Sequence, residues 1–345
     1  MDASIASILI VDGISNGAIY ALMGMATVLL FAVTRVIFIP QGEYVAFGAL
    51  TLAMLQNGQI PGTVWLLLLA AVAVAIGDAV RAALQRETVL NILIGAVRTL
   101  AIPGTVCAIA CVVAPMKLGL LPQAVLSAAL VTSLGSLVYR LAYESIADAP
   151  VLVLLIVSVG VHFALVGLGL LFFGAEGYRN PSFLDVRLNL GPVTLAGQSI
   201  IIVVAAGVLM AMLAVFFEYT VRGKALRATA VNRLGARMMG ISTSSAGRLS
   251  FTLAALIGAL SGLLIGPTTT VFYDTGFLIG LKGFVAAVFA GLASFPLAAV
   301  GAILVGVIEA FGSFWASSFK EVIVFTAILP ILLWRSLRDP HREEH

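Results

Sequence analysis

The sequence predicts an all-α polytopic membrane protein with about 10 transmembrane segments (range about 8–11), including broken or short helices, in two pseudo-symmetric halves. Apolar residues make up 61% of the 345 residues and charged residues only 10%, whereas soluble domains carry about 25% charged residues. Apolar runs of spanning length recur along the chain, separated by short polar loops. The 34 glycines are consistent with closely packed membrane helices.

The first apolar run extends from about Ile5 to Val33. A secretory signal would begin with basic residues, and none precedes this run, so we interpret it as a retained membrane anchor. Gly13 and Gly17 are spaced for close packing against another helix. Asn16 is polar within the run, and it either lines a path through the protein or bonds to a neighbouring helix.

A helix break is expected directly after this run. Pro40 and Gly42 interrupt helical structure, and Glu43 follows at the break. About fourteen apolar residues come next, fewer than the ~20 that span a bilayer, which indicates a broken or re-entrant helix. Such backbone is tolerated at membrane depth only inside protein or beside a watery cavity. Gln41, Gly42 and Glu43 are therefore candidates for a polar path, although Glu43 can alternatively lie at the cytoplasmic headgroups beside Arg35.

Further apolar runs follow at about residues 64–84, 89–114, 118–140 and 150–174. The loops at 81–87 and 139–148 carry arginines and are expected in the cytoplasm, where basic loops concentrate. His162 lies within the last of these runs. An imidazole at that depth is either a substrate contact or proton carrier, or a neutral side chain bonded to nearby backbone.

The segment 175–197 is the longest weakly apolar loop, with charges of both signs, and the run 198–219 follows it. The next segment, 222–248, is basic and contains no acidic residue, so we place it in the cytoplasm. Because one span separates the two segments, 175–197 is expected in the periplasm.

The middle of the basic segment is expected to form one amphipathic helix that ends at Gly240. Its apolar stripe would consist of Leu226, Ala230, Leu234, Met238 and Ile241. Arg233 and Arg237 would form a second, basic stripe. Such a helix either lies on lipid headgroups or provides a docking site for a soluble partner.

The second half contains another packing face and another break. Gly258, Gly262 and Gly266 recur at four-residue spacing, which is typical of close helix contacts. Lys282 and Gly283 precede an apolar stretch of about twelve residues, again too short to span. Glu309 lies among apolar neighbours and must find a partner inside the protein. We expect this partner to be Lys282 or Lys320. The charged tail, residues 336–345, is expected in the cytoplasm.

Several motifs resemble the permease subunits of the branched-chain amino acid ABC transporter family (LivH type). In the basic segment the family pattern is matched by Arg227, Ala228, Ala230, Asn232, Ala236, Gly240 and Ile241. The run NGAIYAL at residues 16–22 resembles the family's first helix, and the stretch from Gly276 to Trp334 resembles its last part nearly end to end. At the first break the family's Gly and Glu are kept, while its Asn and His are replaced by Phe38 and Gln41. Relative to the family, the chain carries roughly two extra spans near residues 78–130.

The resemblance implies a single permease domain over residues 1–345, with a first half at 1–174, a periplasmic loop at 175–197 and a second half at 198–335. It implies that the basic segment couples the chain to an ATPase. The coupling residues would be Arg227, Ala230, Asn232, Arg233, Ala236, Arg237, Gly240 and Ile241. The candidate substrate path would be lined by Asn16, Gln41, Gly42, Glu43, His162, Lys282 and Gly283.

The implied partners are two ATP-binding cassette ATPase subunits, a second permease subunit that is homologous or identical, a periplasmic substrate-binding protein and the surrounding membrane lipid. The implied location is the bacterial inner membrane. The implied substrates are branched-chain amino acids, with related amides and organic acids as alternatives.

Several function classes are not supported by the sequence. It has no phosphate-binding loop and no catalytic set, so we expect no enzyme activity and no cofactor in this chain. Cys107 and Cys111 have no His or carboxylate nearby, so we expect buried apolar filler and no metal site. No basic surface suits a nucleic acid. An ion-coupled secondary transporter that uses Glu43 and Glu309 remains an alternative, and a membrane enzyme is a weaker one.

Overall fold

The computed structural model describes residues 3–86, 88–116, 118–190, 193–292, 294–327, 329–330 and 333. The long helices are α1 (Ala3–Thr34), α3 (Gly62–Leu84), α4 (Val89–Val113), α5 (Leu120–Val138), α6 (Val151–Phe173), α7 (Gly197–Tyr219), α10 (Thr243–Ile265) and α12 (Phe295–Trp315). The shorter helices are α2 (Glu43–Gln56), α8 (Val221–Val231), α9 (Arg233–Met238), α11 (Thr275–Phe289) and α13 (Lys320–Thr326). The tail at 336–345 lies outside the described residues.

The expected fold class is confirmed. Within the described ranges, 8 helices are long and apolar enough to cross a bilayer. The two helices at the expected breaks are short: α2 has 14 residues and α11 has 15. Each is less than the ~20 residues that a span requires.

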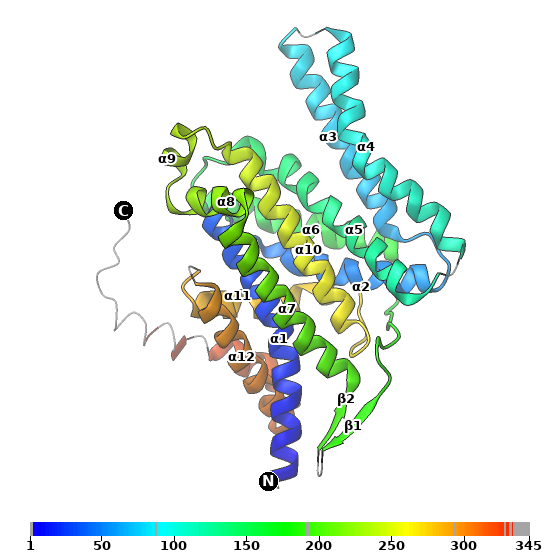
Figure 1. Cartoon of the computed structure of the whole chain (residues 1–345), viewed down its shortest axis with the longest axis vertical. Coiled ribbons are helices and arrows are strands. Elements are labelled where there is room, and N and C mark those ends of the chain that lie inside the picture. The colour runs from blue at the N-terminus through cyan, green and yellow to red at the C-terminus, as the bar shows by residue number, and fades with distance from the viewer. Residues whose placement is uncertain are drawn as a thin grey trace.

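Helix α1 is the centre of the bundle, and α7, α10, α11 and α12 pack around it (Figure 1). The contact with α12 is close because Gly13 and Gly17 have no side chains. A Cβ on Gly13 would lie 2.7 Å from the Cα of Val307, and one on Gly17 would lie 2.7 Å from the Cα of Ile303. The predicted packing role of these two glycines is therefore confirmed.

Helix α10 packs against α2 through the glycine face expected from the sequence. A Cβ on Gly258 would come 2.7 Å from the Cβ of Tyr44, and one on Gly262 would overlap the carbonyl oxygen of Val45. Gly266 lies against Asn180, in the loop before the strands. Close backbone contact thus joins α10 to the helix that follows the first break.

Helices α3 and α4 form a hairpin that projects from the rest of the bundle (Figure 1). Its outer part exposes the large apolar residues Ile76, Val80, Leu84, Val89, Leu90, Leu93, Ile94, Val97 and Ile102. At its base Cys107 is buried, and its Sγ lies 3.6 Å from the carbonyl oxygen of Val64. Cys111 is exposed, so the expectation that the cysteines are buried apolar side chains is correct for Cys107 and wrong for Cys111.

The segment 175–197 contains a short hairpin that the sequence analysis did not predict. Strands β1 (Arg187–Leu190) and β2 (Val193–Ala196) pair antiparallel. They lie at one end of α7, and α8 and α9 lie at the other (Figure 1). The loop and the basic segment are therefore at opposite ends of a helix of spanning length, as expected.

Candidate functional site

The basic segment forms two short helices, α8 and α9, so the prediction of one continuous amphipathic helix is wrong. The break is at Asn232, whose backbone is extended with φ −150° and ψ 102°. Its side-chain Oδ1 accepts a hydrogen bond from the backbone N–H of Gly235 at 2.9 Å. Asparagine is favoured at a helix N-cap, where its side chain accepts a hydrogen bond from an otherwise unpaired backbone N–H. It is less favourable in the interior of a helix, so a new helix begins after Asn232.

The break separates the predicted apolar stripe into two parts. Leu226 on α8 is buried and Ala230 is half-buried, and they face the bundle. Leu234 and Met238 on α9 are 70% and 80% exposed. The stripe therefore does not form one face against the membrane or the protein.

The end of α9 agrees with the expectation. Gly240 has φ +81°, which glycine adopts without strain. Its N–H donates to the carbonyl of Arg237 at 3.0 Å, and the N–H of Ile241 donates to the carbonyl of Ala236 at 2.9 Å. These two bonds define a Schellman motif, which fixes the direction in which the chain continues into α10.

The two arginines of the predicted basic stripe bond to another loop of the same chain. Arg237 donates from Nη2 to both carboxylate oxygens of Asp148, at 2.8 and 3.0 Å. Arg233 donates from Nη1 to the carbonyl of Ala147 at 3.1 Å. Further along, Arg248 at the start of α10 pairs with Glu144. These arginines hold the basic segment to the loop at 144–148, which connects α5 to α6.

Four large apolar side chains of α9 and its junction with α8 are exposed, beside the exposed Asn232 and Arg237. Val231, Leu234, Met238 and Met239 are 86%, 70%, 80% and 83% exposed. We refer to these four residues as the α9 tip. Of the remaining matched positions, Arg227 is exposed and Ala236 is buried.

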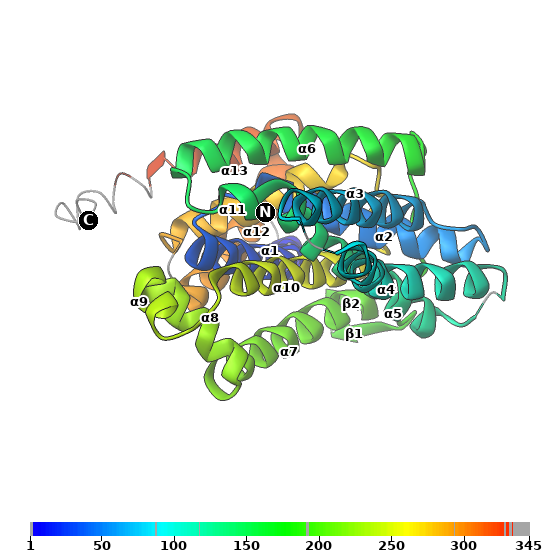
Figure 2. The same ribbon diagram turned by 90° about the horizontal axis from the view of Figure 1, so that it is seen from above.

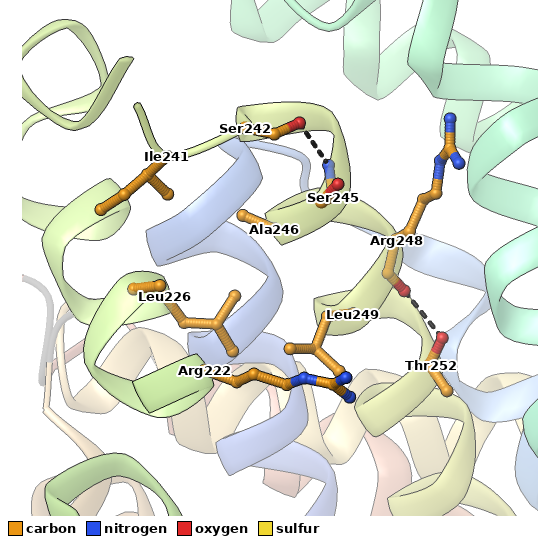
Figure 3. A pocket seen from close by; sticks show the side chains of 10 residues that line it. Arg222, Leu226, Ile241, Ser242, Ser245, Ala246, Arg248, Leu249 and Thr252 are labelled. Carbon is orange, nitrogen blue, oxygen red and sulfur yellow. Dashed lines mark hydrogen bonds between the residues drawn. The ribbon is translucent and has the colours of Figure 1, made fainter. Parts of the chain in front are cut away.

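A cavity of about 410 Å³ lies between α8 and α10 (Figure 3). Leu226, Ile241 and Leu249 supply apolar walls. The guanidinium of Arg248 points away from Leu226 and Ile241 (Figure 3). Ser242 caps α10 by accepting from the N–H of Ser245 at 3.3 Å.

Four of the candidate path residues lie together at the first break: Gln41, Gly42, Glu43 and His162. Glu43 is fully buried, and its Oε1 lies 2.7 Å from Nδ1 of His162 on α6. The partner of Glu43 is therefore His162, and no ion pair joins it to Arg35 among the described residues. Gly42 lies against Gly276 and Gly280 of α11, where a Cβ would overlap backbone. The two short helices thus meet at this point.

Several buried polar atoms at the break have no hydrogen-bond partner among the described residues. They are Oε1 of Gln41, Oε2 of Glu43 and Oη of Tyr44. The other end of the Gln41 amide donates to the carbonyl of Ala254 at 2.8 Å. Because unpaired polar groups are costly inside a protein, these three atoms make the break a candidate site for a bound polar solute.

An apolar cavity of about 290 Å³ lies next to the break. Phe38, Leu155 and Phe277 line it together with Gly280. The ring centroid of Phe277 is 4.8 Å from that of His162. An apolar surface and a buried titratable pair therefore lie side by side.

Lys282 belongs to a separate polar centre. Its Nζ lies 2.6 Å from Oε1 of Glu309 and 3.1 Å from Oε1 of Glu321. The hydroxyl of Tyr20 donates to Oε2 of Glu309 at 2.6 Å. The predicted pair of Glu309 with Lys282 is confirmed, and Lys320 is not its partner.

The sequence analysis missed two members of this centre, Tyr20 and Glu321. Tyr20 lies in NGAIYAL and Glu321 lies in the stretch from Gly276 to Trp334, and the resemblance of these two regions to the family was the available signal. Gly283 packs on Met23 of α1. Asn16 is half-buried on α1, and no hydrogen bond among the described residues joins it to Glu43 or His162.

Comparison with known proteins identifies the family. Residues 84–333 match the model of the branched-chain amino acid transport system / permease component. The permease LivH of Salmonella typhimurium (strain LT2) is 29% identical over 206 residues, covering 58% of this chain and 67% of that protein. LivH of Escherichia coli (strain K12) gives the same values.

A further relative is BraD of Pseudomonas aeruginosa, named as a high-affinity branched-chain amino acid transport system permease protein. It is 29% identical over 211 residues, covering 59% of this chain and 69% of that protein. No solved structure matches. The family match covers most of the chain, so the chain belongs to the family of branched-chain amino acid transport permease components.

Proposed function

We propose that this chain is the transmembrane subunit of an ABC importer and that separate ATPase subunits drive it by docking on the α9 tip. The observation that carries this proposal is the exposure of four large apolar side chains in the middle of the basic segment. Exposed apolar patches rimmed by polar residues mark sites of protein contact. Methionines in such patches adapt to a partner surface because their side chains are flexible and polarizable.

The tip is held firmly enough to transmit a displacement. The Asn232 cap fixes the start of α9, the Schellman motif at Gly240 fixes its end, and Arg237 ties it to Asp148. A displacement of α9 would therefore move the loop at 144–148 and the first turn of α10 together. Since α10 contacts α2 through Gly258 and Gly262, the displacement would reach the helix that begins at Glu43.

The site at the break supports a small solute with one charged and one apolar end. The free Oε2 of Glu43 can accept a hydrogen bond from an ammonium group, and the adjoining 290 Å³ cavity can hold an aliphatic side chain. Branched-chain amino acids have this chemistry, and the relatives are named for their transport. Related amides and organic acids remain alternatives, because Phe38 and Gln41 depart from the family pattern.

The remaining assignments follow from the same proposal. The complex would contain two ATPase subunits, a second permease subunit, identical or homologous, and a periplasmic substrate-binding protein, all at the bacterial inner membrane. The binding protein would contact the segment 175–197. The whole chain would act as one permease domain, and ATP hydrolysis would occur on the partner subunits.

One observation favours a second candidate function. The Glu43–His162 pair is a buried titratable pair inside a membrane protein, which is also the kind of group that carries protons in secondary transporters. In that case uptake would depend on a proton gradient and no ATPase would be needed.

The test is co-purification from cells that express the chain with its neighbouring genes. We expect the wild type to retain ATPase subunits and the double variant Leu234→Glu, Met238→Glu to lose them and to lose uptake. Met116→Glu is the matched control, because Met116 is also exposed but precedes α5, whereas the loop at 144–148 that contacts α9 follows the other end of α5. Retention of ATPase by the double variant, or uptake that follows only the proton gradient, would contradict the proposal.

A further inference from the structure

A polar cavity of about 580 Å³ lies between the projecting α3–α4 hairpin, α5 and the start of α10. Arg98, Arg140 and Arg248 line it, together with Asp78 and the hydroxyl of Thr99. Figure 2, which shows the hairpin end-on, places α4 directly beside α5. The cavity therefore exists because the hairpin lies beside the rest of the bundle.

The charges in this cavity do not balance. Asp78 is engaged by Arg140, which pairs with its Oδ2, and by Thr99, whose Oγ1 lies 3.3 Å away. Arg248 is engaged by Glu144, next to the cavity. Arg98 makes no ion pair with any carboxylate in the described part of the chain.

Arg248 also has an unsatisfied donor. Its Nε is buried and has no hydrogen-bond acceptor among the described residues. The cavity thus combines an unpaired guanidinium with a buried N–H that lacks an acceptor. Both are complementary to the oxygens of an anion, and arginine side chains bind phosphate oxygens in paired geometry.

The position of Arg98 indicates the source of that anion. Arg98 lies on α4, a helix long and apolar enough to span a bilayer, and its neighbours Val97 and Ile102 are exposed. A cation in such a helix is costly unless a counter-charge or water stabilises it, and no carboxylate among the described residues pairs with Arg98. Lipids supply both a phosphate and acyl chains that can cover the exposed apolar surface of the hairpin.

We propose that this cavity binds the phosphate of an anionic phospholipid, with Arg98 as its principal contact and Arg248 as the second donor. The acyl chains lie along the exposed apolar side chains of α4. Because Arg248 and Glu144 also join α10 to the loop at 144–148, bound lipid stabilises the contact between the basic segment and the bundle. This binding is independent of the transport mechanism.

The test uses the full chain in nanodiscs of phosphatidylcholine with a small fraction of phosphatidylglycerol, followed by native mass spectrometry. We expect the wild type to retain phosphatidylglycerol and Arg98→Gln to reduce its occupancy roughly tenfold, the equivalent of one charge-assisted hydrogen bond. Arg81→Gln, an exposed arginine on α3 outside the cavity, is the matched control and should retain the lipid. Equal retention by wild type and Arg98→Gln would overturn the proposal.

Two further measurements complete the test. Inorganic phosphate added at millimolar concentration should not displace the lipid, and displacement would show that the cavity takes a soluble anion instead. If Arg98→Gln does not fold, the proposal is tested by the melting temperature of the wild type in the two lipids. Phosphatidylglycerol should raise its melting temperature relative to phosphatidylcholine with the same acyl chains, and no rise would overturn the proposal.

Discussion

Arg237 on α9 donates to both carboxylate oxygens of Asp148, a residue 89 positions earlier in the chain. Both side chains are substantially exposed, so their ion pair contributes only about 0–1 kcal/mol to stability. Its importance is positional, because it links the α9 tip to the loop between α5 and α6.

Reversing either charge should therefore affect uptake more than stability. We expect Arg237→Asp or Asp148→Arg alone to reduce uptake and ATPase retention while the melting temperature changes little. Combining the two substitutions restores opposite charges and should recover at least part of the uptake. If the combined variant is as defective as the single ones, the pair does not position α9.

The polar centre at Lys282 should be a stability element. Lys282→Met leaves Glu309 and Glu321 without their cation, and breaking a buried ion pair typically costs about 3–5 kcal/mol. The hydroxyl of Tyr20 still binds Glu309, so we expect the lower end of this range, measured by denaturant or thermal unfolding.

Adding Glu309→Gln to Lys282→Met removes the uncompensated charge. The double variant should be more stable than Lys282→Met alone. An unchanged unfolding midpoint for Lys282→Met would contradict a structural role for this centre.

The Glu43–His162 pair should be needed for uptake and dispensable for folding. Glu43→Gln preserves the volume and keeps a side-chain oxygen that can accept a hydrogen bond from His162, so stability should change little. We expect uptake to decrease by roughly tenfold or more, the equivalent of one charge-assisted hydrogen bond. Glu218→Gln, an exposed carboxylate at the end of α7, is the control. Normal uptake by Glu43→Gln would remove this site from the transport path.

The contact between α10 and α2 should not tolerate a side chain at Gly262. A Cβ there would overlap the carbonyl oxygen of Val45, so Gly262→Ala should lower the unfolding midpoint and the yield of folded protein. Gly207→Ala on α7 is the matched control, because nothing lies within 4 Å of a Cβ at that position. It should be neutral or stabilising by about 0.5–1 kcal/mol. Equal midpoints for the two variants would contradict the close contact.

The sequence predicted the features that depend on local composition. Run lengths predicted the spans and the short helix α2, because bilayer thickness sets the number of apolar residues required. They also predicted a second short helix, but α11 begins at Thr275, so Lys282 and Gly283 lie inside this helix and not before it. The rule that a buried charge needs a partner predicted the pairing of Lys282 with Glu309.

Features that depend on long-range contacts could not be predicted in the same way. Glu43 and His162 were each recognised as candidates, but their contact joins residues 119 positions apart. The break at Asn232 could not be predicted, because apolar residues keep their helical spacing on both sides of it. The N-cap hydrogen bond from Gly235 to Asn232 depends on the rotamer of a single side chain. The pairing of Arg237 with Asp148 could not be predicted either, because the two residues are 89 positions apart in the sequence.

The most direct test of the account is photo-crosslinking from the α9 tip in the assembled complex. A benzoylphenylalanine is placed at Met238 and, as a control, at Met116, and the products are identified by mass spectrometry. The account predicts a crosslink from position 238 to an ATPase subunit and none from position 116. Crosslinks from position 238 to lipid alone, in a complex that still transports, would contradict it.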